Sequence, residues 1–348
     1  MKKIIYFLFS TFILTSCQQT LPTTPLNINQ PLSLIKEEKI INYGYGYSII
    51  KDSLLTFLAF ADPSEKFIHI YDTSLHLKLS TGNKGKLFSE FNMPEFYTNN
   101  LIKSNDSLIY LYDMNLLHEK YFNPHILVSS QYPDEEIKGQ YLPTDLYFTT
   151  NLNRLDDSIV IGQSIEENKG IYFTYNKKDK SKKWTKFKYH FRYPNKRYED
   201  YSFLNSICVN PTLKRIAVAF RYFDLIQIYN TQGELQNEIC FSKLKKPLLS
   251  TVASCISPEA SFYFLSISAT AQYCYILRAN KTGIELQKEE KNLSGELIII
   301  DWEGNIKNIY SVPSLLYAIT IDATDTYLYA ITKNYKDPEY AYIQKYKL

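Results

Sequence analysis

The sequence predicts an all-β chain folded as a six-bladed β-propeller with four-stranded antiparallel blades. Three observations predict this fold. The 348 residues include 31 Tyr and 20 Phe, and aromatic side chains pack well on a pleated sheet. A polar turn followed by an apolar strand recurs along the chain about every 50 residues. No helical periodicity of comparable strength accompanies these strands, and a strand-only repeat of this length is typical of propeller blades.

Residues 1–16 have the pattern of a lipoprotein signal peptide. Two lysines open the chain, an apolar run from Ile4 to Leu14 follows, and Cys17 comes directly after Leu-Thr-Ser. This arrangement resembles the export signal of bacterial lipoproteins. The resemblance implies that Cys17 becomes the first mature residue and carries diacylglycerol and an acylated amine. The apolar run is short for a membrane span, whereas two or more acyl chains hold a protein durably on a membrane.

Residues 17–31 are expected to form a lipidated, flexible tether, because they are polar, contain three prolines and show no periodicity. The propeller domain is then expected to cover residues 32–348. Loss of the two leader lysines lowers the formal net charge from +3 to +1. A nearly neutral chain argues against a nucleic-acid-binding role, which usually needs a strong basic excess.

The turn-and-strand unit occurs six times. Asp-Ser pairs at positions 52, 106 and 157 open the first three apolar strands, and Asn-Pro, Ser-Pro and Asp-Ala pairs at 210, 257 and 322 open the others. The equivalent strand residues are Leu54, Leu108, Ile159, Ile216, Tyr263 and Leu328. The fifth interval is the longest, so we expect an insertion at about residues 269–294, after a second strand at Phe262–Ile267.

The third strand of a unit runs through apolar residues to an Asp or Asn. Four segments have this form: Phe67–Asp72, Ile171–Asn176, Leu225–Asn230 and Leu297–Asp301. Glycine in the next turn accepts the positive φ of a tight hairpin, at Gly233 and Gly304. Fourth strands are therefore expected at Leu235–Phe241 and Ile306–Val312.

The last unit lacks a fourth strand of its own, because the chain ends on a third-strand pattern at Ala341–Leu348. We expect the N-terminal segment Ser33–Ile41 to supply the missing strand. That pairing closes the ring and removes exposed strand edges, which otherwise promote aggregation.

With these units in place, the chain resembles the BF3164-like set of six-bladed, TolB-like propeller lipoproteins of Bacteroidetes. Three elements carry the resemblance: the lipobox ending at Cys17, the turn Gly82–Phe91, which is similar to the glycine-rich G-x-G-x-G-P-G-E-F turn of that group, and the strand-and-turn segment Leu297–Asn305. Leu87 to Ser89 depart from the group's turn. The resemblance implies the fold and an envelope location, and no chemistry.

Four cysteines remain besides Cys17, and in an exported protein they allow three disulfide pairings. Cys208 and Cys255 lie in apolar strand-like runs, which favours free, buried thiols. The five histidines never fall at metal-ligand spacing, and His69 is expected to be a packed strand residue. Gly82–Lys86 lacks the hydroxyl and helix of a phosphate loop, so we interpret it as a blade-closing turn.

Sequence identifies no catalytic residue and no cofactor or metal site. Some six-bladed lactonases and lyases hold a divalent cation in the channel, and calcium or zinc in this channel is the alternative here. The side chains available for it are Asn99, Asn205, Asn210 and Asp322. Asn210 and Asp322 stand directly at turns, where such side chains usually accept hydrogen bonds from backbone amides.

Two groups of residues are candidates for a binding surface. One is a basic stretch whose residues 187–192 alternate aromatic and basic side chains, as in an outer strand with one solvated face; its candidates are Lys182, Lys183, Trp184, Lys186 and Lys188. A sharper hypothesis places this stretch against anionic headgroups or glycan phosphate. The other group comprises aromatic loop residues: Tyr97, Tyr132 and Tyr141.

The expected function is that of a membrane-anchored, non-catalytic binding module for an envelope protein or glycan. A channel-metal enzyme of the lactonase or lyase kind is the alternative. Gln18 follows the lipidated cysteine. By similarity to the proteobacterial sorting rule, this residue favours the outer membrane, with the periplasmic or surface face left open.

Overall fold

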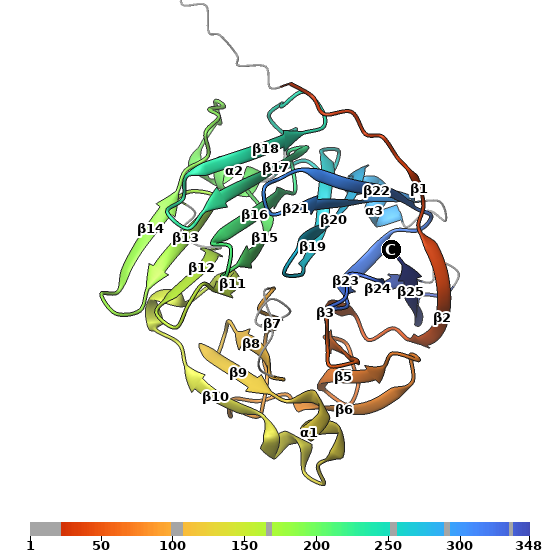
Figure 1. The fold of residues 1–348 in the computed structure, drawn as a ribbon. Coiled ribbons are helices and arrows are strands. Elements are labelled where there is room, and N and C mark those ends of the chain that lie inside the picture. Colours follow the sequence, from red (N-terminus) through yellow and green to blue (C-terminus); the bar gives the residue numbers. More distant parts are fainter. Residues whose placement is uncertain (1–21, 99–106, 165–168, 251–255, 289–292, 334–336) are drawn as a thin grey trace, which may run out of the picture.

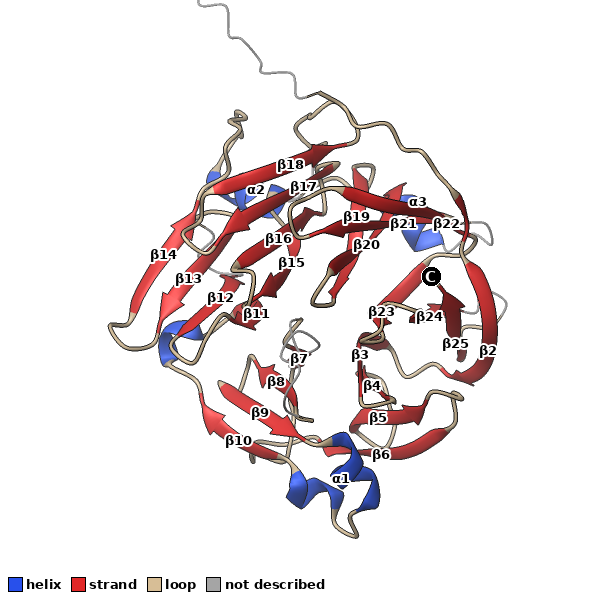
Figure 2. Cartoon of the chain, in the orientation of Figure 1, coloured by secondary structure: helices blue, strands red, loops and turns tan. Residues whose placement is uncertain are grey.

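The computed structural model describes residues 22–98, 107–164, 169–250, 256–288, 293–333 and 337–348. Six small antiparallel sheets stand in a ring around a common axis, as Figure 1 shows. The chain is therefore a six-bladed β-propeller, and the predicted fold class is confirmed. Strands dominate the described residues, and the few helices lie in connections at the outside of the ring (Figure 2). None of those helices is long and apolar enough to cross a bilayer.

The first three blades each run outward from the axis in chain order. Blade 1 consists of β3 (Tyr45–Lys51), β4 (Leu54–Ala59), β5 (Lys66–Asp72) and β6 (Leu77–Asn83). Blade 2 consists of β7 (Pro94–Phe96), β8 (Ile109–Asp113), β9 (His118–Phe122) and β10 (Lys138–Tyr141). Blade 3 consists of β11 (Thr149–Arg154), β12 (Ile159–Ser164), β13 (Tyr172–Asn176) and β14 (Ser181–Thr185). Short helices flank β10: α1 (Pro124–Ser129), η1 (Pro133–Glu136) and η2 (Thr144–Leu146).

The last three blades complete the ring. Blade 4 consists of β15 (Asn205–Asn210), β16 (Arg215–Phe220), β17 (Leu225–Asn230) and β18 (Leu235–Cys240), preceded by α2 (Lys196–Ser202). Blade 5 consists of β19 (Ser261–Ala269), β20 (Tyr273–Thr282), β21 (Gly295–Asp301) and β22 (Ile306–Val312), with α3 (Gly283–Lys288) after β20. Blade 6 consists of β23 (Leu316–Ile321), β24 (Tyr327–Lys333) and β25 (Tyr340–Lys347).

The predicted turns connect the strands as expected in most blades. Asp52 and Ser53 both have positive φ, at 47° and 66°, and form the tight hairpin between β3 and β4. Such a hairpin needs left-handed backbone at both central residues, which Asp tolerates better than most residues. Gly233 and Gly304 likewise have φ of 83° and 86° in the turns before β18 and β22.

Blade 5 differs from the sequence-based assignment. Residues 262–267 belong to β19, which is the innermost strand of this blade and not its second strand. The expected insertion instead contains the true second strand, β20, followed by α3. The Ser-Pro turn at 257 therefore leads into the blade, whereas the equivalent turns elsewhere connect its first two strands.

The N-terminal segment closes the ring as predicted. Strand β2 (Ser33–Ile41) pairs antiparallel with β25 as the outermost strand of blade 6. Just before it, β1 (Gln30–Pro31) pairs parallel with β22 at the edge of blade 5. Blade 6 thus has four strands and the open edge of β25 is covered, while β1 adds a short fifth strand to blade 5.

The segment before β1 is held along the ring, contrary to the expectation of a free tether. The backbone N of Thr24 donates to the carbonyl of Cys240 at 2.7 Å, and that of Asn29 donates to the carbonyl of Ile309 at 3.0 Å. Leu26 packs against the core between blades 4 and 5. We call residues 24–32 the strap; it passes along the outer edges of these two blades (Figure 1).

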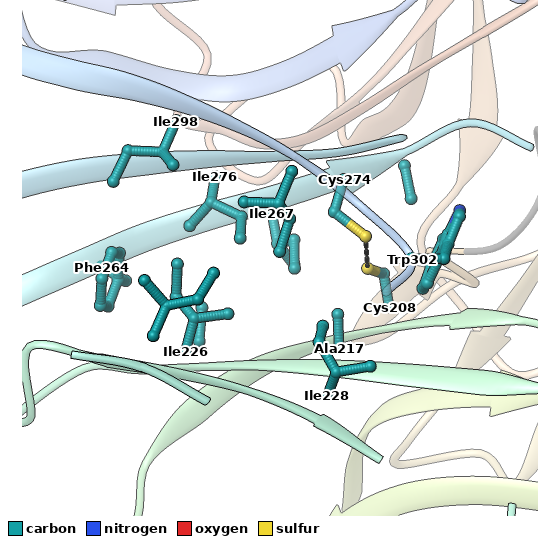
Figure 3. Packing of buried hydrophobic residues seen from close by; sticks show 14 of the residues in the cluster. Cys208, Ala217, Ile226, Ile228, Phe264, Ile267, Cys274, Ile276, Ile298 and Trp302 are labelled. Atoms are coloured by element: carbon teal, nitrogen blue, oxygen red, sulfur yellow. Dashed lines mark hydrogen bonds between the residues drawn. The ribbon is translucent and has the colours of Figure 1, made fainter. Parts of the chain in front are cut away.

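The core consists of apolar side chains between neighbouring blades. Between blades 4 and 5, Cys208 and Cys274 face each other with 3.6 Å between their sulfurs, beside Trp302 and Ile228 (Figure 3). Both thiols are free and fully buried, and burial holds the pKa of Cys274 well above its usual value. Cys240 is also free and buried, which confirms the predicted state for these three, while Cys255 lies outside the described residues.

Candidate functional site

The innermost strands enclose a cavity of about 450 Å³ around the propeller axis. We call this cavity the channel mouth. Its polar lining includes Tyr47, Glu95, Asn151, Gln163, Asn205 and Arg221. These side chains come from blades 1 to 4, with β19 and β23 completing the wall. A cavity of this size lies in the range of small-ligand sites, which combine an enclosed space with a few convergent polar groups.

Glu95 is the most unusual of these residues, because it is a carboxylate only 6% exposed. Strand β7 places it among donors: the hydroxyl of Tyr112 donates to its carboxylate, as does the backbone N of Asn151 at 3.2 Å. The hydroxyl of Tyr47 is a third hydrogen-bond partner. Burial nevertheless outweighs these bonds and raises the pKa of Glu95, because a desolvated carboxylate favours its neutral form.

Arg221 brings positive charge to the same cavity. It follows β16 directly, and its backbone N donates to the carbonyl of Leu204 at 2.8 Å, which fixes its place at the wall. Its charge acts to lower the pKa of Tyr47, while burial and Glu95 raise it. In the part of the chain that the structure describes, no carboxylate forms an ion pair with Arg221. A guanidinium in this position is suited to a planar anion, which it binds through two parallel hydrogen bonds.

Three amide side chains form a connected group on the wall of the channel mouth. A bulge in β11 gives Asn151 a positive φ of 51°, and its side-chain N donates to the side-chain O of Gln163 at 2.7 Å. Asn205 uses its side-chain N on the carbonyls of Ile171 and Phe203. Its Oδ1 is buried and has no hydrogen-bond partner among the described atoms. Bulges commonly redirect side chains toward functional sites.

A buried chain of hydrogen-bonded side chains runs from the cavity into blade 1. Tyr45 lines the channel mouth, and its hydroxyl lies 3.2 Å from Nδ1 of His69, whose Nε2 lies 3.0 Å from the carboxylate of Asp62. Burial lowers the pKa of His69 and favours the neutral imidazole. His69 is 1% exposed within β5, so its interpretation as a packed strand histidine is confirmed.

The aromatic candidates are distributed differently from what sequence suggested. Tyr97 is 1% exposed and donates its hydroxyl to Glu119 at 2.6 Å, so it is a core residue and not part of an exposed loop. Tyr132 and Tyr141 are exposed, at 60% and 74%, but they stand at the outer edge of blade 2 beside β10. The three tyrosines therefore do not form one surface.

The basic candidates divide into two groups. Lys182, Lys183 and Trp184 belong to β14, where the Lys182 ammonium donates to the carbonyl of Asp145 at 2.7 Å and Trp184 packs on Phe173. Lys186 and Lys188 lie beyond the end of this strand.

The strand predicted at residues 187–192 is wrong, because the segment there is irregular. Its alternation has another cause: Phe187, Tyr189 and Phe191 all pack onto the core of blade 4, while the basic side chains between them remain exposed.

The proposed channel-metal ligands do not come together. Asn210 and Asp322 accept hydrogen bonds from backbone amides of their own turns, which confirms the turn interpretation. Of the three that the structure describes, Asn205 alone lines the channel mouth. Asn99 lies outside the described residues. Across the described ranges, no group of three or more His, Cys, Asp or Glu side chains is placed to hold a metal ion.

Sequence reasoning missed Glu95 and Arg221. The signal for Glu95 is a charged residue between Pro94 and Phe96 in an otherwise apolar stretch, and β7 buries all three. Arg221 had no comparable signal, because it follows an apolar strand as many solvated turn residues do. Only the ring brings these two positions to one cavity.

Comparison with known proteins supports the anchor and the fold. Residues 1–18 match the model of the prokaryotic membrane lipoprotein lipid attachment site. The chain is thus a lipid-anchored propeller protein of the cell envelope. No curated protein matches it.

Two solved structures have a similar fold. One is a member of the DUF4221 family from Bacteroides vulgatus, with a TM-score of 0.55 and 12% identity over 91% of this chain and 97% of that chain. The other is described as an exported protein from Bacteroides fragilis, with a TM-score of 0.51 and 12% identity over 90% and 93% of the two chains. At this identity the similarity shows the fold alone.

Proposed function

We propose that this protein is a non-catalytic binding module that holds an envelope glycan in the channel mouth. One observation carries the proposal: Glu95, Gln163 and Asn205 are each more than nine-tenths buried and line the same cavity of about 450 Å³. Buried polar groups cost stability unless they are paired, and the Oδ1 of Asn205, which has no partner among the described atoms, supports a ligand that donates a hydrogen bond to it.

The lining chemistry favours a sugar. Sugar hydroxyls both donate and accept hydrogen bonds, as do the amides of Asn151 and Asn205. The rings of Tyr47 and Tyr317 provide flat apolar surface for a sugar ring. Arg221 suits the carboxylate of an acidic sugar, since it has no partner of opposite charge in the described structure. An envelope protein inserting a loop is the competing partner.

A channel-metal lactonase or lyase remains the second candidate, favoured by the carboxylate of Glu95 in the channel. Calcium or zinc there would need further ligands beside it, and the neighbouring oxygen donors are amides and hydroxyls. Stoichiometric metal in purified protein, together with turnover of a lactone or a uronate polymer, would favour this candidate over the binding module.

The finer features of the proposal concern location and family. Gln18 after the lipidated cysteine supports an outer-membrane position, by analogy with the sorting rule. The resemblance of Gly82–Phe91 to the BF3164-like turn supports membership of that group. The segment follows β6 and closes blade 1, as a blade-closing turn does.

The test is glycan capture by the mature lipidated protein in detergent micelles. Envelope glycan fragments are applied, and the retained sugars are identified by mass spectrometry. We expect Arg221→Gln to reduce retention at least tenfold. Arg215→Gln is the matched control, because Arg215 forms an exposed ion pair with Glu303 away from the cavity. Equal retention by both variants would contradict the channel site. Retention of a protein without any sugar would show that the partner is a protein and not a glycan.

A further inference from the structure

A basic surface lies on the outer side of blade 4, close to the point where the strap begins. We call it the basic flank and define it by six exposed residues: Lys186, Lys188, Arg192, Lys243, Lys245 and Lys246. They come from two segments that lie side by side. The Lys246 ammonium donates to the carbonyl of Arg192 at 3.1 Å. Tyr189 and Leu244, one from each segment, pack on the same hydrophobic cluster.

Acidic residues neutralise only part of this surface. Glu238 on β18 forms an ion pair with Lys188 at 3.2 Å and accepts a hydrogen bond from the hydroxyl of Tyr189. On the neighbouring helix α2, Asp200 is paired with Lys196 at 2.7 Å. The three lysines at 243, 245 and 246 have no acidic residue among them in the segment 241–250. The basic flank therefore keeps an excess of positive charge.

The lipid anchor places this surface near the membrane. Thr24 is fixed to Cys240 by a backbone hydrogen bond of 2.7 Å, and Lys243 follows Cys240 by three residues. Thr24 is the seventh residue after the lipidated Cys17. A chain extends by at most about 3.6 Å per residue, so Thr24 stays within roughly 25 Å of the lipid. Figure 1 shows the strap beginning beside β18.

We propose that the basic flank docks on the anionic phosphate headgroups of the membrane that holds the lipid anchor. Short tethering keeps the local concentration of headgroups high, and clusters of four to eight Lys or Arg beside a membrane anchor are typical of binding to anionic lipid. The attraction acts within a Debye length of about 10 Å, which the tether permits. The outer edge of blade 4 then faces the membrane, and the channel mouth opens to the side, where a ligand can enter.

The test uses the mature lipidated protein on two kinds of vesicle, one of phosphatidylcholine alone and one with a third of phosphatidylglycerol. Amide hydrogen exchange is measured for segments 186–192 and 241–248. We expect exchange there to slow at least threefold on the anionic vesicles, and the effect to disappear in 0.5 M NaCl. The triple variant K243E/K245E/K246E should abolish it.

The matched control is K178E/K180E/K183E, which changes the net charge equally but lies on the β13–β14 hairpin of blade 3. This control should keep the slowing. Thermal unfolding of both variants establishes that each is folded. Equal exchange on the two vesicles, or loss of slowing in the control alone, would overturn the proposal. Slowing that survives high salt would show a contact that is not electrostatic and would also overturn it.

Discussion

A single buried lysine organises the connection between blades 1 and 2. Lys120 lies in the middle of β9 with no exposed surface, and its ammonium donates to the carbonyls of Leu87, Phe88 and Glu90. Burial lowers its pKa to about 8, although the charges of Asp113 and Glu90 act in the opposite direction. The ammonium therefore holds the loop of residues 87–90 in place through hydrogen bonds to its backbone.

We predict that Lys120→Met lowers the free energy of unfolding by about 3 kcal/mol, because three backbone carbonyls lose the donor that the buried ammonium provides. Denaturant unfolding measures this. The folded protein also binds fewer protons than the unfolded chain between pH 8 and pH 10.5, so this group makes wild-type stability rise with pH across that window. Lys120→Met should lack that rise. An unchanged midpoint would show that the three bonds contribute little.

Glu95 predicts the opposite dependence of stability on pH. Its pKa is raised in the folded state, so the folded protein keeps a proton that the unfolded chain loses above about pH 4.5. Wild-type stability should therefore fall as pH rises from 4.5 to the folded pKa. Around it, Tyr47 and Tyr112 stay neutral in this range, because burial raises the pKa values of both hydroxyls.

The comparison is between wild type and Glu95→Gln, with melting temperatures measured from pH 4 to pH 8. The melting temperature of the variant should rise relative to that of the wild type as pH increases, since Gln cannot ionise. A difference that stays constant over this range would mean that Glu95 ionises normally in the folded protein.

At the scale of elements, the closing strand β2 makes the clearest prediction. Its backbone amides alternate between pointing at β25 and pointing at solvent, so one of two adjacent residues must donate to the ladder. The double substitution Glu37→Pro/Glu38→Pro removes that bond. We expect a loss of about 3 kcal/mol and self-association through the exposed edge, seen by light scattering. Glu37→Ala/Glu38→Ala is the control and should remain monomeric.

Sequence patterns predicted the strands wherever the turn chemistry repeats. Asp-Ser, Asn-Pro and Asp-Ala turns lead into β4, β12, β16 and β24, because each turn type has a backbone shape that reverses the chain between two strands. In blade 5 the sequence-based assignment of strands was displaced by one strand. Its Ser-Pro turn resembles the other turns but precedes the innermost strand. The run at Tyr273–Thr282 is as strand-like as its neighbours, but no recurring turn pair precedes it.

At the scale of the whole molecule, the ring decides which polar residues become a site. Glu95, Asn151, Asn205 and Arg221 are spread over more than a hundred positions of the chain, and each looks ordinary beside its sequence neighbours. They come together because four separate strands or strand ends place these residues toward the propeller axis. The repeat period and the composition do not specify which residues do so. The fold class and the anchor were predictable from sequence, whereas the channel mouth was not.

The strap adds an expectation about the whole molecule. Because it crosses the edges of blades 4 and 5, it connects the lipid anchor to the body of the propeller over nine residues. Replacing Leu26 and Asn29 by glycine should free the strap, leave the ring closed by β2 and lower stability by about 2 kcal/mol. Proteolysis of the strap should then accelerate severalfold, as followed by mass spectrometry.

Hydrogen exchange on the mature protein, with and without the glycan fraction that it retains, tests the central claim most directly. We predict slower exchange in segments 45–47, 95–98, 149–151 and 204–206, which border the channel mouth, and no change in β14 or β10 at the outer edges. Slowing at the outer edges with none around the channel would contradict the account.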